Sequence, residues 1–166
     1  QFVWRERRLL ERYIERDLFF KKSLRPYLVG EGAPQIAVDM VWAGNMAGVG
    51  PMAAVAGAFA HYTGMWLLKK TSRVVVENGG DIFLFCSEPL RVGIFAGRSP
   101  FSEKLSLEIK PMVRPRGICT SSGTVGPSYS EGRADAAVIL ASNTILADAV
   151  ATAAANKIQT EDDLQG

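Results

Sequence analysis

Asp148 and Thr152 lie four residues apart in an alanine-rich segment near the end of the chain. If that segment is helical, both side chains lie on one face, about one turn apart. A carboxylate and a hydroxyl are hard ligands that hold Mg²⁺ when a substrate phosphate and water complete its coordination. We therefore expect Asp148 and Thr152 to be metal ligands. In the alternative, Asp148 only complements the helix dipole and Thr152 packs against the core.

A glycine turn between two apolar runs is the second candidate. It reads Asn78-Gly79-Gly80-Asp81. Asn-Gly and Gly-Gly supply the positive φ that tight hairpins require, so a plain hairpin accounts for the pattern. Because the loop lacks Cβ atoms, it also lets a ligand reach main-chain N–H groups, as phosphate and flavin sites often need. We expect all four residues to contact a cofactor.

A loop rich in hydroxyl groups follows at residues 120–126, with the sequence Thr-Ser-Ser-Gly-Thr-Val-Gly. It lacks the Gly-Lys-Ser/Thr ending of a P-loop and is not a Gly-x-Ser-x-Gly elbow, so a serine hydrolase is not favoured. Its hydroxyls and glycines could bind an anion, or the loop could simply be solvated. The cofactor-binding residues expected here are Thr120, Ser121, Ser122, Gly123 and Thr124.

A further glycine segment, Gly48-Val49-Gly50-Pro51-Met52, is expected to open a helix. The free N–H groups at a helix start can meet a phosphate, which makes Gly48, Gly50 and Met52 candidate cofactor contacts. In the alternative, the segment is a turn between two packed helices.

The chain has one histidine, His61, and two cysteines, Cys86 and Cys119. This count removes most nucleophile–histidine pairs and nearly all zinc sites. We expect His61 to lie on a helix face with one ordinary hydrogen bond, and both cysteines to lie inside a sheet. Two cysteines without a visible signal peptide favour a reducing cytoplasm.

The composition describes one globular domain over residues 1–166. A chain of 166 residues, 48% of them hydrophobic, can bury a core without a metal or disulfide, which excludes disorder, collagen and coiled coil. The net charge of +2 does not point to nucleic acid or a membrane surface. Because the chain begins at Gln1 rather than Met, a preceding segment is left open.

Hydrophobic periodicity places helices before strands. Helices are expected over residues 2–20, 36–47, 52–69 and 145–157. Six β-rich runs are expected at residues 73–77, 81–85, 91–95, 105–109, 117–120 and 136–140. Helices, then a strand meander, then a final helix predict an α+β fold with an antiparallel β-sheet backed by helices.

Residues 40–68 carry no charge and exceed the ~20 apolar residues that span a bilayer. The stretch is nevertheless rich in glycine and interrupted by a proline, and its apolar content is largely alanine. We expect two buried helices separated by a turn, and no membrane partner.

Taken in order, these segments resemble the ApbE-like superfamily, whose characterised members are flavin transferases that move FMN from FAD onto a protein threonine. The resemblance covers residues 44–158 and includes the Glu-Asn-Gly-Gly-Asp turn at 77–81 and the Ala-Asp-Ala-Val-Ala-Thr segment at 147–152. The chain is most similar to a short, uncharacterised branch. The resemblance implies an α+β fold related to the T-fold, and a site for FAD or another nucleotide diphosphate with Mg²⁺.

The chain departs from the transferases at groups that matter for chemistry. The lysine of their first glycine segment is absent from residues 50–56, and Gly-Arg-Ala-Asp-Ala at 132–136 replaces a histidine-containing stretch. Pro127 also stands where this branch often has a histidine. FMN transfer needs a proton acceptor, and the remaining catalytic candidates are Asp135 and Asp81, with His61 third.

Two function hypotheses remain. In the first, the protein is a flavin transferase, or a degenerate relative of one, that binds a flavin or related nucleotide diphosphate with Mg²⁺. In the second, it is a non-catalytic cofactor-binding protein or an oligomeric scaffold built from copies of itself. A nucleic-acid binder is least favoured, because the arginines of residues 1–20 alternate with glutamates and no aromatic platform accompanies them.

Overall fold

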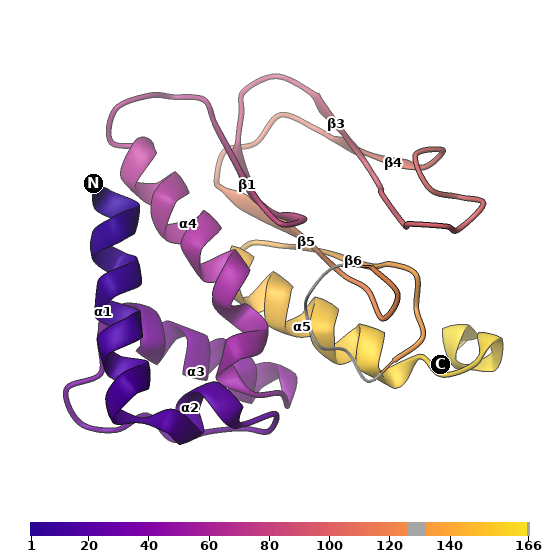
Figure 1. Ribbon diagram of the computed structural model, residues 1–166. Helices are drawn as coiled ribbons and strands as arrows, with labels where there is room; N and C mark the ends of the chain where they lie inside the picture. The colour runs from indigo at the N-terminus through magenta and orange to yellow at the C-terminus, as the bar shows by residue number, and fades with distance from the viewer. Residues whose placement is uncertain (126–131, 166) are drawn as a thin grey trace.

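Helices occupy the first part of the chain and strands the middle in the computed structural model, which describes residues 1–125 and 132–165 (Figure 1). The helices are α1 (Phe2–Arg16), α2 (Leu18–Lys22), α3 (Gln35–Ala47), the 3₁₀ helix η1 (Pro51–Ala54), α4 (Val55–Leu67), α5 (Thr144–Lys157) and the 3₁₀ helix η2 (Glu161–Gln165). The strands are β1 (Val74–Asn78), β2 (Asp81–Phe85), β3 (Leu90–Gly93), β4 (Ser106–Ile109), β5 (Arg116–Ser121) and β6 (Ala137–Ala141). The α+β class is confirmed.

The strands form two sheets, not the single meander that we expected. β1, β2, β5 and β6 pair in that order, always antiparallel, while β3 and β4 pair only with each other. We call this second sheet the β3–β4 ribbon. Figure 1 shows it lying apart from the main sheet, so the chain leaves that sheet after β2 and returns to it at β5.

The predicted helix over residues 2–20 is wrong in one respect, because it breaks at Asp17. The Asp17 carboxylate accepts hydrogen bonds from the Phe20 N–H (3.1 Å) and from the Tyr27 hydroxyl (2.7 Å). The first of these bonds caps the start of α2, and a cap of this kind begins a new helix in a different direction.

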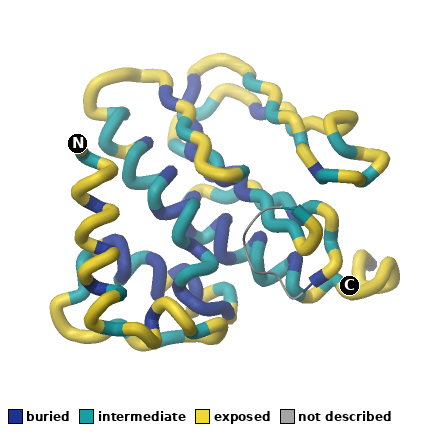
Figure 2. The backbone as a smooth tube through the Cα atoms, in the orientation of Figure 1, coloured by how far each residue is buried: buried dark blue, intermediate teal, exposed yellow. Residues whose placement is uncertain are grey.

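Helix α5 lies at the centre of the fold, packed on the main sheet and against α3 and α4. Four of its alanines, Ala147, Ala149, Ala151 and Ala155, are completely buried. Small side chains let neighbouring backbones approach closely, so α5 can be packed on several sides (Figure 2). Its start is fixed by Asn143, whose side chain accepts from the backbone N–H groups of Ile145 and Leu146.

The uncharged stretch at 40–68 forms two packed helices joined by a turn, as expected. No helix within residues 1–125 and 132–165 has the length and apolar character needed to cross a membrane.

The two cysteines and the histidine also have defined places in the fold. Cys86 and Cys119 are buried and form no disulfide. Cys119 lies within β5 as predicted, whereas the prediction is wrong for Cys86, which directly follows the end of β2. The hydrogen bond expected for His61 is not seen at Nδ1, which is buried without a partner among the described residues. The ring instead packs edge-on against Phe83, with the centroids 5.6 Å apart.

Candidate ligand-binding cleft

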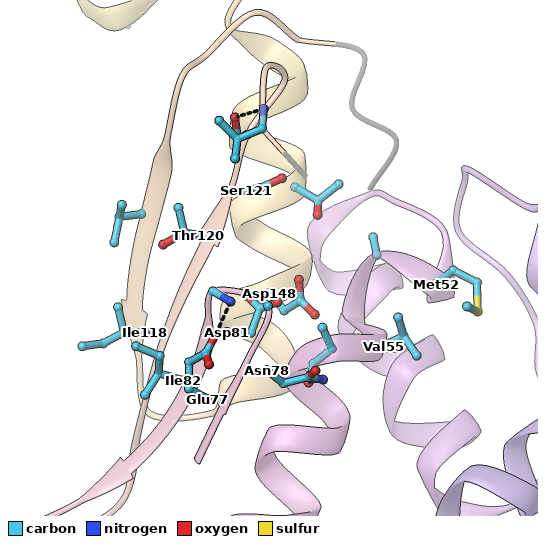
Figure 3. Close-up of a pocket in the computed structure, with 18 of the residues that line it drawn as sticks. Met52, Val55, Glu77, Asn78, Asp81, Ile82, Ile118, Thr120, Ser121 and Asp148 are labelled. Atoms are coloured by element: carbon cyan, nitrogen blue, oxygen red, sulfur yellow. Dashed lines mark hydrogen bonds between the residues drawn. The ribbon is translucent and has the colours of Figure 1, made fainter. Parts of the chain in front are cut away.

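A cavity of about 820 Å³ lies where the main sheet, the β3–β4 ribbon, one face of α5 and the segment that leads into α4 meet. This volume lies within the roughly 300–1,000 Å³ of small-molecule sites. Figure 3 shows polar side chains from the β1–β2 turn, the end of β5 and α5 around one space. The polar residues expected to bind a ligand that do line it are Asn78, Asp81, Thr120, Ser121, Ser122, Asp148 and Thr152.

The β1–β2 turn forms one edge of the cleft. Asn78 pairs with Asp81, so Gly79 and Gly80 make a two-residue loop, with φ values of +67° and +103°. Such values are strained for residues with a Cβ, which explains both glycines. Asn78 Nδ2 donates to the Ala56 carbonyl (3.0 Å) and fixes the turn against α4. Both glycines line the cavity, so their backbone is within reach of a ligand.

Asp148 projects from α5 and is held by α4. Its Oδ2 accepts a hydrogen bond of 2.7 Å from the Gly57 N–H. A Cβ at Gly57 would lie 2.6 Å from the Asp148 Cβ and 2.6 Å from the Thr144 carbonyl oxygen. Only glycine at this position lets α4 approach α5 closely enough to donate that bond, so the pairing of α4 with α5 positions Asp148.

Asp81 and Asp148 form a buried acidic pair, 6% and 8% exposed. Burial raises the pKa of Asp81 to about 6. Burial is also the main cause that raises the pKa of Asp148 well above its usual range, and the nearby Asp81 charge adds to it. Oδ1 of Asp81 has no hydrogen-bond partner among the described residues. An unsatisfied buried oxygen beside a second carboxylate favours a bound proton or cation.

The hydroxyl loop is only partly directed at the cleft. Thr120, Ser121 and Ser122 line it, whereas Gly123 and Thr124 do not appear among its lining residues. The Ser122 hydroxyl oxygen accepts from the backbone N–H groups of Thr124 (3.0 Å) and Val125 (2.9 Å), which organises the loop itself. Gly126 and Pro127, which the sequence analysis also considered, lie outside the described residues.

Two other expected site residues have structural places instead. Asp135 is exposed, does not line the described cavity, and accepts a hydrogen bond of 3.0 Å from the Thr124 hydroxyl. Gly48 ends α3 in a left-handed conformation, with φ +76°, and does not line the cavity either. Gly50 and Met52, by contrast, do line it.

An apolar wall completes the cleft, and none of the sequence motifs described above includes its residues. Val92 and Leu107, cross-strand partners in the β3–β4 ribbon, face the cavity opposite strand residues that include Ile82, Ile118 and Val138. These residues come from five separate strands, and only the departure of the ribbon from the main sheet brings them together. Their one signal in the sequence was ordinary strand alternation, which does not distinguish a ligand wall from a core.

Asp81, Asp148 and Thr152 contribute two carboxylates and a hydroxyl to the lining of the cleft. Within residues 1–125 and 132–165, no group of three or more His, Cys, Asp or Glu side chains could hold a metal. Asp148 and Thr152 therefore fit a hard cation only if other oxygens complete its shell. The unpartnered Asp81 oxygen is one observation that agrees with positive charge at this place.

The fold and the cavity define an α+β protein with a cleft that is lined by both polar and apolar residues. The model of a family described as AbpE bacteria matches residues 1–165. UPF0280 proteins from Methanosphaerula palustris and Methanospirillum hungatei are 49% and 47% identical over 90% and 92% of this chain. The chain belongs to this family, whose curated relatives are called UPF0280 proteins.

The match extends over most of this chain but not over most of its relatives. A UPF0280 protein from Methanothermobacter thermautotrophicus is 46% identical over 98% of the chain, and that match covers 63% of the relative's own length. The same share, 63%, applies to the two relatives above. The chain thus spans less than two thirds of the curated relatives it matches.

The resemblance to the ApbE-like superfamily is corrected by these findings. The family model and the similar proteins identify the UPF0280 family, and neither links the chain to ApbE-like flavin transferases. Residues 77–81, together with Asp148 and Thr152, carried the resemblance and nevertheless line one cleft. The function must therefore be argued from that cleft.

Proposed function

We propose that the cleft binds a nucleotide diphosphate, FAD or a related molecule, together with Mg²⁺ at Asp148 and Thr152. One observation carries the proposal: a buried carboxylate pair with an unpartnered oxygen lies in the same cavity as a glycine turn, hydroxyl groups and an apolar wall. A ligand that satisfies all these surfaces has a phosphate part and a flat apolar part.

The acidic pair dictates how a phosphate can enter. Two carboxylates repel an anion, and the repulsion is strong in a buried site because the effective dielectric constant is low. Mg²⁺ would neutralise both the carboxylates and the diphosphate. Asp148, held by the Gly57 N–H, and Thr152, one turn later on α5, would then orient the phosphate end of the ligand.

The remaining surfaces suit the other parts of the same ligand. Val92, Leu107 and Ile118 offer an apolar slot between the β3–β4 ribbon and the sheet, which suits an isoalloxazine or a nucleobase. The backbone N–H of Gly79, and the hydroxyls of residues 120–122, can donate to phosphate oxygens. The ring, the phosphates and the cation of such a ligand are thus each matched by a different part of the cleft.

Binding without group transfer is the second candidate, and the described cleft gives a reason for it. Asp135, one of two expected proton acceptors, is outside the cavity, and no histidine is among the described lining residues. Asp81 lines the cavity, but its carboxylate belongs to the acidic pair that a cation would engage. A role as a cofactor carrier, or as a scaffold of several copies, is therefore proposed alongside a transferase.

Three broader expectations also remain proposals. They are a relation of the fold to the T-fold, assembly into a homo-oligomer, and a cytoplasmic location, which the two unpaired buried cysteines favour. Because the chain spans less than two thirds of its relatives, the activity of the whole protein is itself a proposal.

Calorimetry with FAD, with and without MgCl₂, tests the binding proposal. We expect FAD to bind at least tenfold more tightly with Mg²⁺, an effect of about 1.4 kcal/mol. Asp148→Ala and the nearly isosteric Thr152→Val should each remove most of this dependence, while the exposed control Asp162→Ala should keep it. Equal affinity with and without Mg²⁺ in the wild type would refute the proposal.

The same samples separate the two candidates. Chromatography after incubation with FAD and Mg²⁺ should reveal FMN or AMP if the protein transfers a group. Intact FAD, still bound with the Mg²⁺ dependence above, identifies a binding protein.

A further inference from the structure

The cleft has one basic residue among its described lining residues, Lys21, against three carboxylates. The carboxylates are those of Glu77, Asp81 and Asp148. Among the lining residues that the structure describes, Lys21 is therefore the one that can place a positive charge beside a ligand.

Lys21 lies in α2, a helix of only five residues that is anchored unusually firmly. Phe20, the preceding residue, is completely buried between Tyr13 and Tyr27, with both rings edge-on at centroid distances of 5.2 and 6.1 Å. Asp17 caps the helix and accepts from the hydroxyls of both tyrosines, at 3.1 and 2.7 Å. Its anchors fix the backbone that carries Lys21.

The segment after Lys21 packs directly on the glycine turn of the cleft. A Cβ at Gly50 would overlap the carbonyl oxygen of Ser23, so glycine at position 50 permits this contact. Gly50, Ser23 and Leu24 all line the cavity. In Figure 1, α2 and the β3–β4 ribbon lie at opposite sides of the molecule, and both contribute lining residues to the cleft.

The Lys21 ammonium is available for a ligand. It forms no ion pair among residues 1–125 and 132–165, although Arg5, Arg7 and Arg73 each pair with a glutamate. Its neighbour Lys22 belongs to the same helix but is not a lining residue. An ammonium group binds phosphate as a point charge through several N–H donors.

We propose that Lys21 is an anion-binding residue of the cleft, which contacts a phosphate of the ligand at the end away from the apolar slot. This assignment rests on the proposed function and makes it more specific. The ligand is then held in three places, with its ring against the ribbon, its cation at Asp148 and its outer negative charge at Lys21. Selectivity for phosphorylated over unphosphorylated ligands follows.

Lys21→Gln and the matched control Lys22→Gln test the assignment, because both remove one charge from the same exposed helix. With MgCl₂ present, calorimetry should show that FAD binds about five- to tenfold more weakly to Lys21→Gln and less than twofold more weakly to Lys22→Gln. Riboflavin, which has no phosphate, should bind equally to both variants. The affinity of Lys21→Gln for FAD should also fall less steeply with added salt than that of the wild type.

The outcomes distinguish this assignment from the proposal beneath it. If the wild type binds FAD with Mg²⁺ dependence but the two variants have equal affinity, Lys21 is not a phosphate contact and the proposed function stands. If Lys21→Gln weakens riboflavin as much as FAD, Lys21 acts through packing and the assignment is overturned. If the wild type does not bind FAD, the proposed function fails and this assignment fails with it.

Discussion

The inner wall of the cleft and the β3–β4 ribbon are built on different principles, although both line the same cavity. The inner wall, formed by the β1–β2 turn and α5, depends on close backbone approaches and on buried charge. The ribbon pairs only with itself, and along β3 exposed residues alternate with half-buried ones. We therefore expect the rigid inner wall to suit a cation site, and the more exposed ribbon to adjust to the flat ring of a ligand.

The comparison implies that equivalent changes have unequal costs in the two walls. Gly57→Ala places a Cβ 2.6 Å from the Thr144 carbonyl oxygen, so α4 and α5 must separate. We expect a loss of about 2–4 kcal/mol in the free energy of unfolding, together with loss of Mg²⁺-dependent binding. In the ribbon, Gly93→Ala meets no atom within 4 Å and should change stability by less than about 0.5 kcal/mol.

Urea unfolding of both variants measures the difference. Similar midpoints for Gly57→Ala and Gly93→Ala would show that the approach of α4 to α5 is not the constraint that positions Asp148.

Buried carboxylates make the stability of the inner wall dependent on pH. The pKa of Asp81 is raised to about 6, mainly by burial. At pH values between the pKa of the unfolded chain and this raised pKa, the folded protein therefore binds more protons than the unfolded chain does. The resulting destabilisation is absent below about pH 4, grows as the pH rises, and is complete above about pH 6. In EDTA, Asp81→Asn should therefore raise Tm at pH 8, by roughly 4–8 °C for about 2 kcal/mol, and not at pH 4.

Asp162→Asn is the control for that measurement, because it removes a carboxylate that is exposed and does not line the cleft. It should not raise Tm at pH 8. A Tm gain for Asp81→Asn that is the same at pH 4 and pH 8 would mean that ionisation of Asp81 does not oppose folding.

The sequence predicted the elements of both walls better than their arrangement. Each of the six strands and the final helix begins and ends within about one residue or two of its expected range, because alternation and the Asn143 cap are local signals. The break at Asp17 was missed because one of its causes, the Tyr27 hydroxyl, lies ten residues further along the chain. The anchoring of Lys21 was missed for the same reason.

Proximity in sequence also misled the assignment of site residues. Asp135 follows the hydroxyl loop closely, but its partner is Thr124, and that bond directs it away from the described cavity. Asp81 and Asp148 are 67 residues apart, yet β2 and α5 bring them into electrostatic contact. The four-residue spacing predicted that Asp148 and Thr152 share one face of a helix. Only the packing of β2 against α5 determines that Asp81 is the carboxylate next to Asp148.

The smallest effect we predict concerns the ribbon, and it tests whether that wall contacts a ring. Leu107→Ala removes a half-buried side chain that lines the cleft, so it should cost about 1 kcal/mol of stability and weaken FAD binding about three- to tenfold. Inorganic pyrophosphate with Mg²⁺ should bind as it does to the wild type, because the polar wall is intact. Leu105→Ala, which truncates a side chain that is 50% exposed and not a lining residue, should change neither affinity. If Leu107→Ala weakens pyrophosphate as much as FAD, the two walls are not independent, and a loosened ribbon disturbs the cation site as well.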